Sequence, residues 1–247
     1  EIPSLCKTLI LRQYRCVGLI EKFFVSLTEI LKAMGQYIQK LIAQGEHQQL
    51  DFKYCISDSK KIARSLVAFS NTDGGKLLLG VKDNGRIAGV RSDEEFYMIE
   101  AAAELFSKPP VPCQIREWTE DGKTILEVSI PKSIVLPHYA KDENGKWKAY
   151  IRVNDQNLLA NTVLLKAWKR KKSNNGLFIR YTDKEKLLLD FLKENENITF
   201  NKYYRMAKIP RHIAEKILVN MLLLDIIEMQ FTEKAVFYRL KNERTES

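Results

Sequence analysis

The sequence predicts an α+β fold, in which a mixed sheet flanked by helices is followed by a smaller domain of three helices and a hairpin. Short apolar runs alternate with helical patterns through residues 35–167, and turn signals join several of these runs into hairpins. The pattern changes after residue 181. A hydrophobic fraction of 45% and a charged fraction of 29% are typical of a globular protein with a proper core.

The first part of the chain combines helical spacing with one alternating strand. Residues 1–34 are expected to form an N-terminal helical extension, because their apolar side chains fall near helical spacing. A short amphipathic helix is expected over residues 35–43, and residues 50–56 alternate like a strand. The Ser-Asp-Ser run at residues 57–59 supplies N-cap chemistry for a helix that ends near Ser70.

A buried strand and a hairpin come next. The apolar run over residues 76–81 lies between turn signals, which is typical of a central strand. Asn84 and Gly85 tolerate the positive φ that a tight hairpin turn requires. We therefore expect residues 86–90 to return as the neighbouring strand.

The first domain is completed by further helices and strands and spans residues 35–167. Prolines at positions 109, 110 and 112 end the helix that follows the hairpin. The expected elements are a helix over 93–106, a hairpin of strands over 114–118 and 124–130, a strand over 148–153 and a helix over 161–170.

The region over residues 181–241 has the pattern of a winged helix-turn-helix. Thr182 and Glu185 form a capping box, in which each side chain satisfies a free backbone N–H group at the start of a helix. A second short helix is expected over residues 200–207, and a third begins at Pro210, a favoured first-turn residue. Two strands, over residues 226–231 and 235–240, complete the pattern.

The formal net charge of +9 is concentrated in one short segment. Residues 166–180 hold six basic side chains and no acidic one, whereas residues 35–165 carry equal numbers of each sign. We interpret residues 168–180 as a basic linker that attracts phosphate, and residues 242–247 as a tail. A solvated linker without a ligand is the alternative. The expected nucleic-acid contacts in the linker are Lys169, Arg170, Lys171 and Lys172.

The third helix of the winged pattern holds the other candidate contacts. In this arrangement the last helix enters the major groove, and its early residues, here Arg211 and His212, face the bases. Lysines near it more often bind phosphate. Further contacts are expected from Arg205, Lys208 and Lys216. The alternative is a winged helix used for dimerisation or protein contacts, and a homodimer is expected from the class.

Four ordered motifs resemble the Schlafen-type AlbA domain over roughly residues 36–167. They are Gly45-Glu46 through Leu50-Asp51-Phe52-Lys53, residues 68–75, residues 79–85 with Gly89, and residues 149–153. The resemblance implies a bacterial protein of the DNA-binding regulator type, since bacterial members often carry a C-terminal winged helix. Some members are described as nucleotide-binding, but this sequence contains no Walker A loop.

The same resemblance implies an alternative activity, because some Schlafen proteins are metal-dependent RNA nucleases with three carboxylates. The matching positions are Glu46, Asp51 and Asp83, with Asp51 standing where the family usually has Glu. Such a cluster would bind Mg or Mn and activate water, while Lys53 would neutralise phosphate charge. Each carboxylate also has a structural alternative: Glu46 at a helix end, Asp51 paired with Lys53, and Asp83 in the Asp-Asn-Gly turn.

Two further sites are candidates for phosphate or nucleic acid. The backbone N–H groups of Asn71, Thr72, Gly74 and Gly75 could cradle a phosphate. We favour a structural interpretation, because a Thr-Asp-Gly-Gly run more often stops a helix. Arg152 is expected to face either nucleic acid or Asp155.

Cysteine usage and hydropathy bound the setting of the protein. The four cysteines form no CxxC pair, which favours a reducing, cytoplasmic compartment. The apolar stretch over residues 8–31 is interrupted by charges, so no membrane helix is expected. The leading hypothesis is a DNA-binding transcriptional regulator that has no catalytic activity. The sequence identifies no cofactor for it. RNA as the partner, a metal-dependent nuclease and a protein-interaction module are the alternatives.

Overall fold

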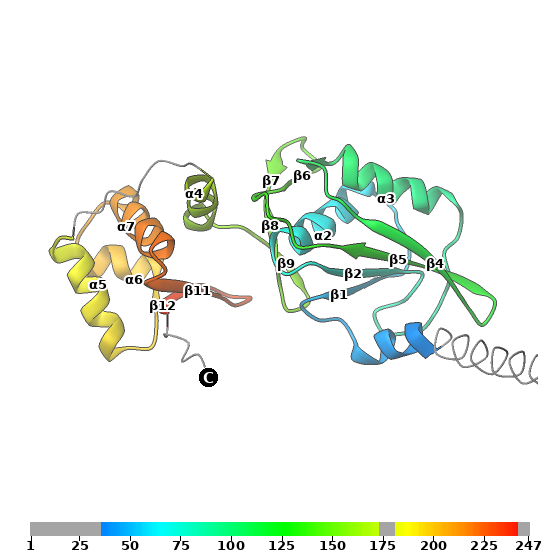
Figure 1. Ribbon diagram of the computed structural model, residues 1–247, viewed down its shortest axis with the longest axis horizontal. Coiled ribbons are helices and arrows are strands. Elements are labelled where there is room, and N and C mark those ends of the chain that lie inside the picture. The colour runs from blue at the N-terminus through cyan, green and yellow to red at the C-terminus, as the bar shows by residue number, and fades with distance from the viewer. Residues whose placement is uncertain (1–35, 173–180, 242–247) are drawn as a thin grey trace, which may run out of the picture.

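The computed structural model describes residues 36–172 and 181–241. The predicted extension over residues 1–34, part of the predicted linker and the tail lie outside the described residues. The described chain mixes helices with several sheets, which confirms the α+β prediction (Figure 1).

A four-stranded mixed sheet forms the centre of the N-terminal part. Its strand order is β1-β2-β5-β4. β1 pairs in parallel with β2, and the other two pairings are antiparallel. A parallel pair needs a crossover connection, which α2 (Ser59–Asn71) provides. The strands are β1 (Leu50–Lys53), β2 (Gly75–Leu79), β4 (Gln114–Glu120) and β5 (Lys123–Ile130).

Helices cover both faces of this sheet, and each face has its own apolar core. α2 and α3 (Glu94–Glu104) pack on one face, where Phe69 and Leu77 are fully buried. The helix over residues 36–44 covers part of the other face, where Phe52 and Leu78 are buried. Because side chains alternate along a strand, neighbouring positions of β2 feed the two cores in turn.

Smaller sheets flank α2 and differ in part from the sequence-based expectation. The predicted strand over residues 148–153 is divided into β7 and β8, and β8 continues into the unpredicted β9. β3 and β7 both pair with β6. The bounds are β3 (Ser107–Lys108), β6 (Tyr139–Lys141), β7 (Trp147–Lys148), β8 (Tyr150–Val153) and β9 (Gln156–Leu159).

The predicted return strand over residues 86–90 is wrong. This segment makes only an isolated bridge between Val81 and Ile87. The carbonyl oxygen of Gly80 accepts hydrogen bonds from the N–H groups of Ala88 and Gly89, at 2.8 and 2.9 Å. Gly80 has a φ of +89°, so the chain turns there and a regular ladder cannot continue.

The C-terminal unit, defined as α4 through β12, is built around a second core. α5, α6 and α7 are followed by the antiparallel pair β11 and β12, in the predicted order, and β10 pairs with β12. The bounds are α4 (Thr162–Lys171), α5 (Asp183–Glu194), β10 (Ile198–Thr199), α6 (Phe200–Met206), α7 (Arg211–Leu223), β11 (Ile227–Phe231) and β12 (Val236–Leu240).

α4 shares the core of the C-terminal unit. Val163 and Ala167 of α4 are buried in the same cluster as Leu218 of α7 and Tyr238 of β12. Residues up to 167 are predicted to belong to the first domain, whereas these contacts associate α4 with the C-terminal helices.

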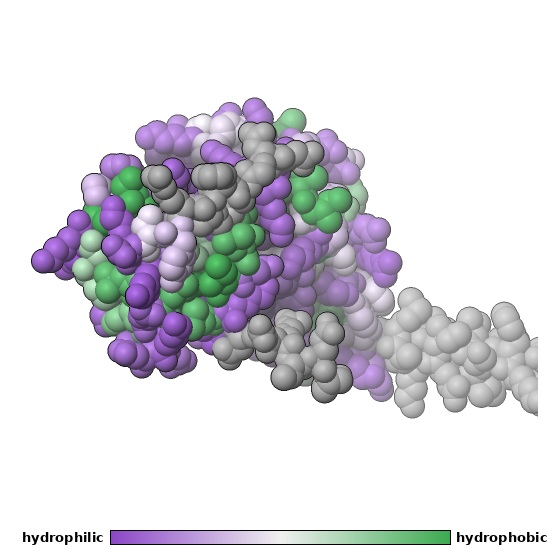
Figure 2. All heavy atoms as spheres, turned by 60° about the vertical axis from the view of Figure 1, so that its left-hand side comes forward, coloured by the Kyte–Doolittle hydropathy of each residue, from purple (hydrophilic) through white to green (hydrophobic). Residues whose placement is uncertain are grey.

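Polar side chains predominate on the face that Figure 2 shows, with a strip of hydrophobic residues among them. The apolar side chains of Leu164, Trp168, Leu223 and Met229 line a groove of about 290 Å³ between α4 and β11.

Within the described ranges, no helix is both long and apolar enough to cross a bilayer.

Candidate nucleic-acid interface

The first turn of α7 presents basic side chains on a fixed backbone. Ile209 is buried in the second core, and its N–H group donates to the carbonyl oxygen of Tyr204 at 3.1 Å. Pro210 then begins the helix from an extended conformation. Arg211 and His212 follow at once, and both are exposed. The anchored turn therefore holds these two predicted contact residues at the surface.

Arg211 is braced by polar and aromatic neighbours on α6. Its Nη2 donates to Oδ1 of Asn201 at 3.2 Å. The guanidinium carbon lies 5.2 Å from the ring centroid of Tyr204 and 5.9 Å from that of Phe200. Such cation–π contacts restrict the rotamers of the arginine. A restrained guanidinium loses less conformational entropy when it binds phosphate or a base edge.

Tyr204 lies between two arginines in the same surface. Nε of Arg205 donates to the Tyr204 hydroxyl at 3.4 Å, and its guanidinium carbon is 5.9 Å from the ring centroid. The hydrogen bond from Arg205, helped by the charge of Arg211, lowers the pKa of the Tyr204 hydroxyl. The positive charge around this hydroxyl suits contact with a phosphate oxygen.

The remaining predicted contacts of this region are also exposed. Lys208 occupies the turn before α7 with a φ of +49°, and Lys216 lies further along the helix. The first turn of α7 contains no acidic residue. Within residues 36–172 and 181–241, no salt bridge joins Arg205, Lys208, Arg211 or Lys216 to an acidic side chain. Their charges are therefore available to an anionic ligand.

The basic segment predicted as a linker begins inside α4, which corrects that expectation for residues 168–171. Lys166 of α4 pairs with Glu215 of α7, and Nη1 of Arg170 donates to Oδ1 of Asn220 at 2.6 Å. These contacts fix α4 against α7. Lys169, Lys171 and Lys172 are exposed, and no described acidic residue forms a salt bridge with them.

The structure brings Glu46 and Asp51 together but surrounds them with basic and backbone donors. Oδ2 of Asp51 lies 2.9 Å from Nζ of Lys53. Oε1 of Glu46 accepts the N–H of Phe52 at 2.8 Å and lies 4.0 Å from the Lys53 ammonium. Burial, reinforced by the neighbouring Asp51 carboxyl, raises the pKa of Glu46. The Lys53 ammonium is therefore close enough to form a salt bridge with both carboxylates.

Asp83 does not join the other two carboxylates in a metal-binding group. It is exposed in the turn that closes with the N–H of Gly85 donating to the carbonyl oxygen of Lys82 at 2.7 Å. Among the described residues, no group of three or more His, Cys, Asp or Glu side chains is arranged to hold a metal ion. The geometry thus matches the structural alternatives for Asp51 and Asp83.

Arg152 is buried, so the expectation that it faces nucleic acid or Asp155 is wrong. Only 2% of the residue is exposed. Its Nη2 lies 3.3 Å from Oδ1 of Asp51 and donates to the carbonyl oxygen of Leu50 at 3.2 Å, while Nη1 donates to Asn157 Oδ1 at 3.2 Å. The guanidinium ties β8 to β1 inside the protein.

The predicted phosphate cradle is occupied by contacts within the protein. The Asn71 amide is buried and donates to the carbonyl oxygens of His138 and Tyr150, each at 2.9 Å. Thr72 Oγ1 donates to the carbonyl oxygen of Ala68 and accepts the N–H of Arg152. Gly74 has a φ of +70°, and Gly75 begins β2. The run stops α2, as the structural interpretation expected.

A cationic cluster around Tyr54 was not identified from the sequence. Nη2 of Arg91 donates to the Tyr54 hydroxyl at 2.6 Å, and its guanidinium carbon is 4.9 Å from the ring centroid. Nζ of Lys82 lies 5.1 Å from the same centroid. The three residues are distant in sequence, so no local pattern joins them. The only hint of this cluster in the sequence is Lys82, a basic residue directly before the Asp-Asn-Gly turn.

The solved structures similar to this chain include two that are each below 20% identical to it. The DIP2311 protein from Corynebacterium diphtheriae matches with 18% identity and a TM-score of 0.40, over 61% of this chain and 30% of its own. The N-terminal domain of a protein from Nitrosomonas europaea, named as related to the ATP-dependent DNA helicase RecG, matches with 19% identity and a TM-score of 0.35. That match covers 60% of this chain and 97% of the domain.

The family comparison is specific to the N-terminal part of the chain. None of the curated proteins matches. The match covers less than a third of the length of the Corynebacterium protein. Residues 46–161 match the family described as Schlafen, AlbA_2, which confirms the resemblance that the four motifs predicted for this region.

Proposed function

We propose that this protein binds duplex DNA through a C-terminal winged helix-turn-helix, as a transcriptional regulator does. The observation that carries the proposal is the exposed basic start of α7, where Arg211 is braced by Tyr204 and Asn201. The succession of α5, α6 and α7 followed by the β11–β12 pair supports the winged-helix assignment. In that fold the last helix lies in the major groove.

Each group of basic residues has a proposed role. Arg211 and His212 contact base edges, because they begin the helix that enters the groove. Lys208, Lys216 and the lysines of α4 contact phosphates, which fixes the position of the helix without reading sequence. The match of residues 46–161 to the Schlafen AlbA_2 family accords with a nucleic-acid partner.

Fluorescence anisotropy with a labelled DNA duplex tests the role of Arg211. We expect Arg211→Ala to weaken binding by about 1–3 kcal/mol, and Arg211→Lys to recover part of the phosphate contribution but not the bidentate geometry. Arg116→Ala is the matched control, because Arg116 is an exposed arginine on β4 of the N-terminal sheet. Equal affinity of the parent and Arg211→Ala would refute the role of α7.

A structured RNA and a divalent metal distinguish the alternatives. Tighter binding of RNA than of duplex DNA would replace the proposed DNA partner by RNA. Cleavage of that RNA with Mg²⁺ or Mn²⁺, abolished in Asp83→Ala, would establish the nuclease alternative, although only Glu46 and Asp51 of its three carboxylates are adjacent. Light scattering with and without the duplex tests the expected homodimer.

A further inference from the structure

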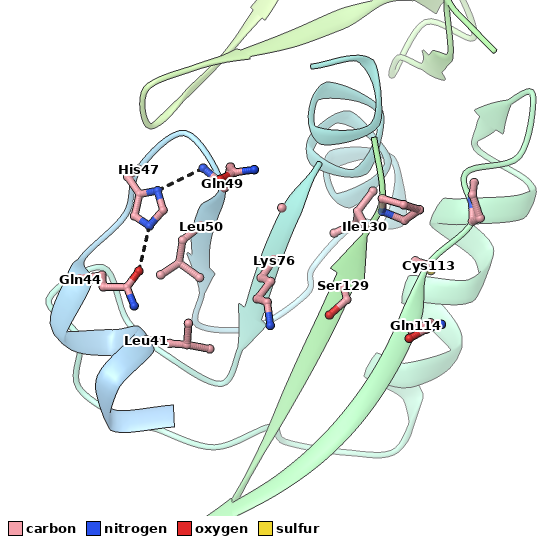
Figure 3. Close-up of a pocket in the computed structure, with 13 residues that line it drawn as sticks. Leu41, Gln44, His47, Gln49, Leu50, Lys76, Cys113, Gln114, Ser129 and Ile130 are labelled. Carbon is pink, nitrogen blue, oxygen red and sulfur yellow. Dashed lines mark hydrogen bonds between the residues drawn. The ribbon is translucent and has the colours of Figure 1, made fainter. Parts of the chain in front are cut away.

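A cavity of about 730 Å³ opens on the face of the central sheet opposite α2 (Figure 3). Leu41 and Gln44, on the helix over residues 36–44, lie on one side of it. Cys113 and Gln114 lie on the other side, and Lys76 and Ser129 lie between them. This volume is within the range of small-molecule sites, which are mostly apolar with a few polar groups.

The strand register places a row of polar groups across the floor of the cavity. Leu50 is the direct partner of Lys76, Lys76 of Ser129, and Ser129 of Gln114, on four successive strands of the sheet. Their side chains therefore point to one face. Since neighbouring strands are about 4.8 Å apart, the row from Lys76 to Gln114 spans about 10 Å and offers both donors and acceptors.

The charge on this floor is already balanced. Nζ of Lys76 lies 2.6 Å from Oε1 of Glu127, whose residue is only 1% exposed. The Tyr37 hydroxyl and the Trp118 indole N–H donate to the same carboxylate at 2.7 and 2.8 Å. A charged ligand would lose its hydration without gaining an unpaired counter-charge, which is costly.

His47, at the rim, is held by contacts with two neighbouring residues. Its Nδ1 accepts the N–H of Gln49 at 3.2 Å, and its Nε2 faces Oε1 of Gln44 at 3.3 Å. Both ring nitrogens therefore have a polar neighbour within hydrogen-bond distance. The rim therefore adds polar side chains to the cavity.

The walls are apolar and stand on both sides of the polar row. Leu41 and Leu50 line one side, and Pro112, Cys113 and Pro131 line the other. Burial raises the pKa of the Cys113 thiol, which therefore behaves as a small apolar group at neutral pH. Apolar side chains at both ends of a hydrogen-bonding floor favour a ligand that presents one polar edge to the sheet and apolar ends to the walls.

We propose that this cavity binds an uncharged planar heterocycle with donors and acceptors along one edge, the chemical class of the nucleobases. The edge of the ring contacts Lys76, Ser129 and Gln114, and the two ends of the ring system contact the apolar walls. The site lies on the N-terminal sheet and does not depend on DNA binding by α7.

Calorimetric titration with four nucleosides, adenosine, inosine, cytidine and uridine, tests the proposal. At least one should bind saturably, and benzoate, a planar anion, should bind far more weakly. Gln114→Ala should weaken the nucleoside by about fivefold through loss of one hydrogen bond. Ser129→Phe should abolish binding by filling the cavity, and circular dichroism reports whether this variant is folded.

Gln156→Ala is the matched control, because Gln156 is an exposed amide on β9 outside the cavity. It should bind the nucleoside like the parent. The proposal is overturned if none of the four nucleosides binds, if benzoate binds as tightly, or if Gln114→Ala and a folded Ser129→Phe both retain the parental affinity.

Discussion

Asp51 and Arg152 show how a charged residue can be conspicuous in the sequence and structural in the protein. Both are about 2% exposed, and they join the edge of the central sheet to β8. Lys53 supplies a second cation to Asp51. A buried ion pair adds little net stability to a protein, because both charges lose their hydration. Removing one member is strongly destabilising, because the other charge then stays buried without a counter-ion.

Replacing Asp51 therefore tests its structural role. Asp51→Asn should lower the free energy of unfolding by about 3–5 kcal/mol, because the Arg152 guanidinium remains buried without its counter-ion. Urea denaturation measures the change. Asp83→Asn, in an exposed turn, should change stability by less than about 0.5 kcal/mol. Similar losses in both variants would contradict this account of Asp51.

Glu127 predicts a pH dependence of stability. Burial alone would raise the pKa of its carboxyl, but hydrogen bonds from Lys76, Tyr37 and Trp118 outweigh burial and lower it below the ordinary value of 4.5. A lowered folded-state pKa stabilises the protein above that ordinary value, and the contribution is lost as the pH falls through the folded value. Urea unfolding of the parent and Glu127→Gln should therefore converge in acid. Parallel stability curves at all pH values would refute this.

Single residues differ in how much of their setting the sequence reveals. The Thr182–Glu185 capping box involves neighbours along the chain, and the structure confirms it. The partner of Arg152 is 101 positions away, and that of Lys76 is 51 positions away. Such pairs depend on strand register, which a sequence pattern leaves open.

At the scale of elements, the start of α5 depends on its cap. The N–H of Thr182 donates to Oε2 of Glu185 at 2.9 Å, and the Thr182 side chain accepts the N–H of Lys184 at 3.3 Å. Thr182→Ala should lower the free energy of unfolding by about 1 kcal/mol, whereas Thr182→Ser should retain most of it. Thermal or urea unfolding measures the difference, and equal stability of the two variants would contradict the capping role.

Elements whose signal is local were predicted well. The amphipathic spacing of α7 and the alternation of β11 and β12 place these elements within a residue or two of their observed bounds. The segment over residues 86–90 has strand-like composition but lacks a ladder, since the turn at Gly80 directs two N–H groups to one carbonyl. β9 was not predicted. It pairs with β8 across the short turn around Asn154, a residue with positive φ.

At the scale of the whole molecule, the distribution of charge matters more than its sum. The region over residues 35–165 is electrically balanced, and several of its lysines and arginines pair with acids inside the fold. The basic surface of α4 and α7 is different, because Lys169, Lys171 and Lys172 are exposed and form no salt bridge with an acidic side chain among the described residues. The position of this charge along the chain follows from the sequence. In the structure, the first part of the basic segment is helical and packs on α7.

The salt dependence of duplex binding shows whether the α4–α7 surface binds DNA phosphates, as we propose. The logarithm of the binding constant should fall linearly with the logarithm of salt concentration, because bound lysines release counterions. Replacing Lys169, Lys171 and Lys172 by Gln should reduce the slope by about 2–3. The same change at Lys184, Lys186 and Lys193 of α5 should leave it nearly unchanged. A slope near zero for the parent, or equal slopes for both triple variants, would contradict the account.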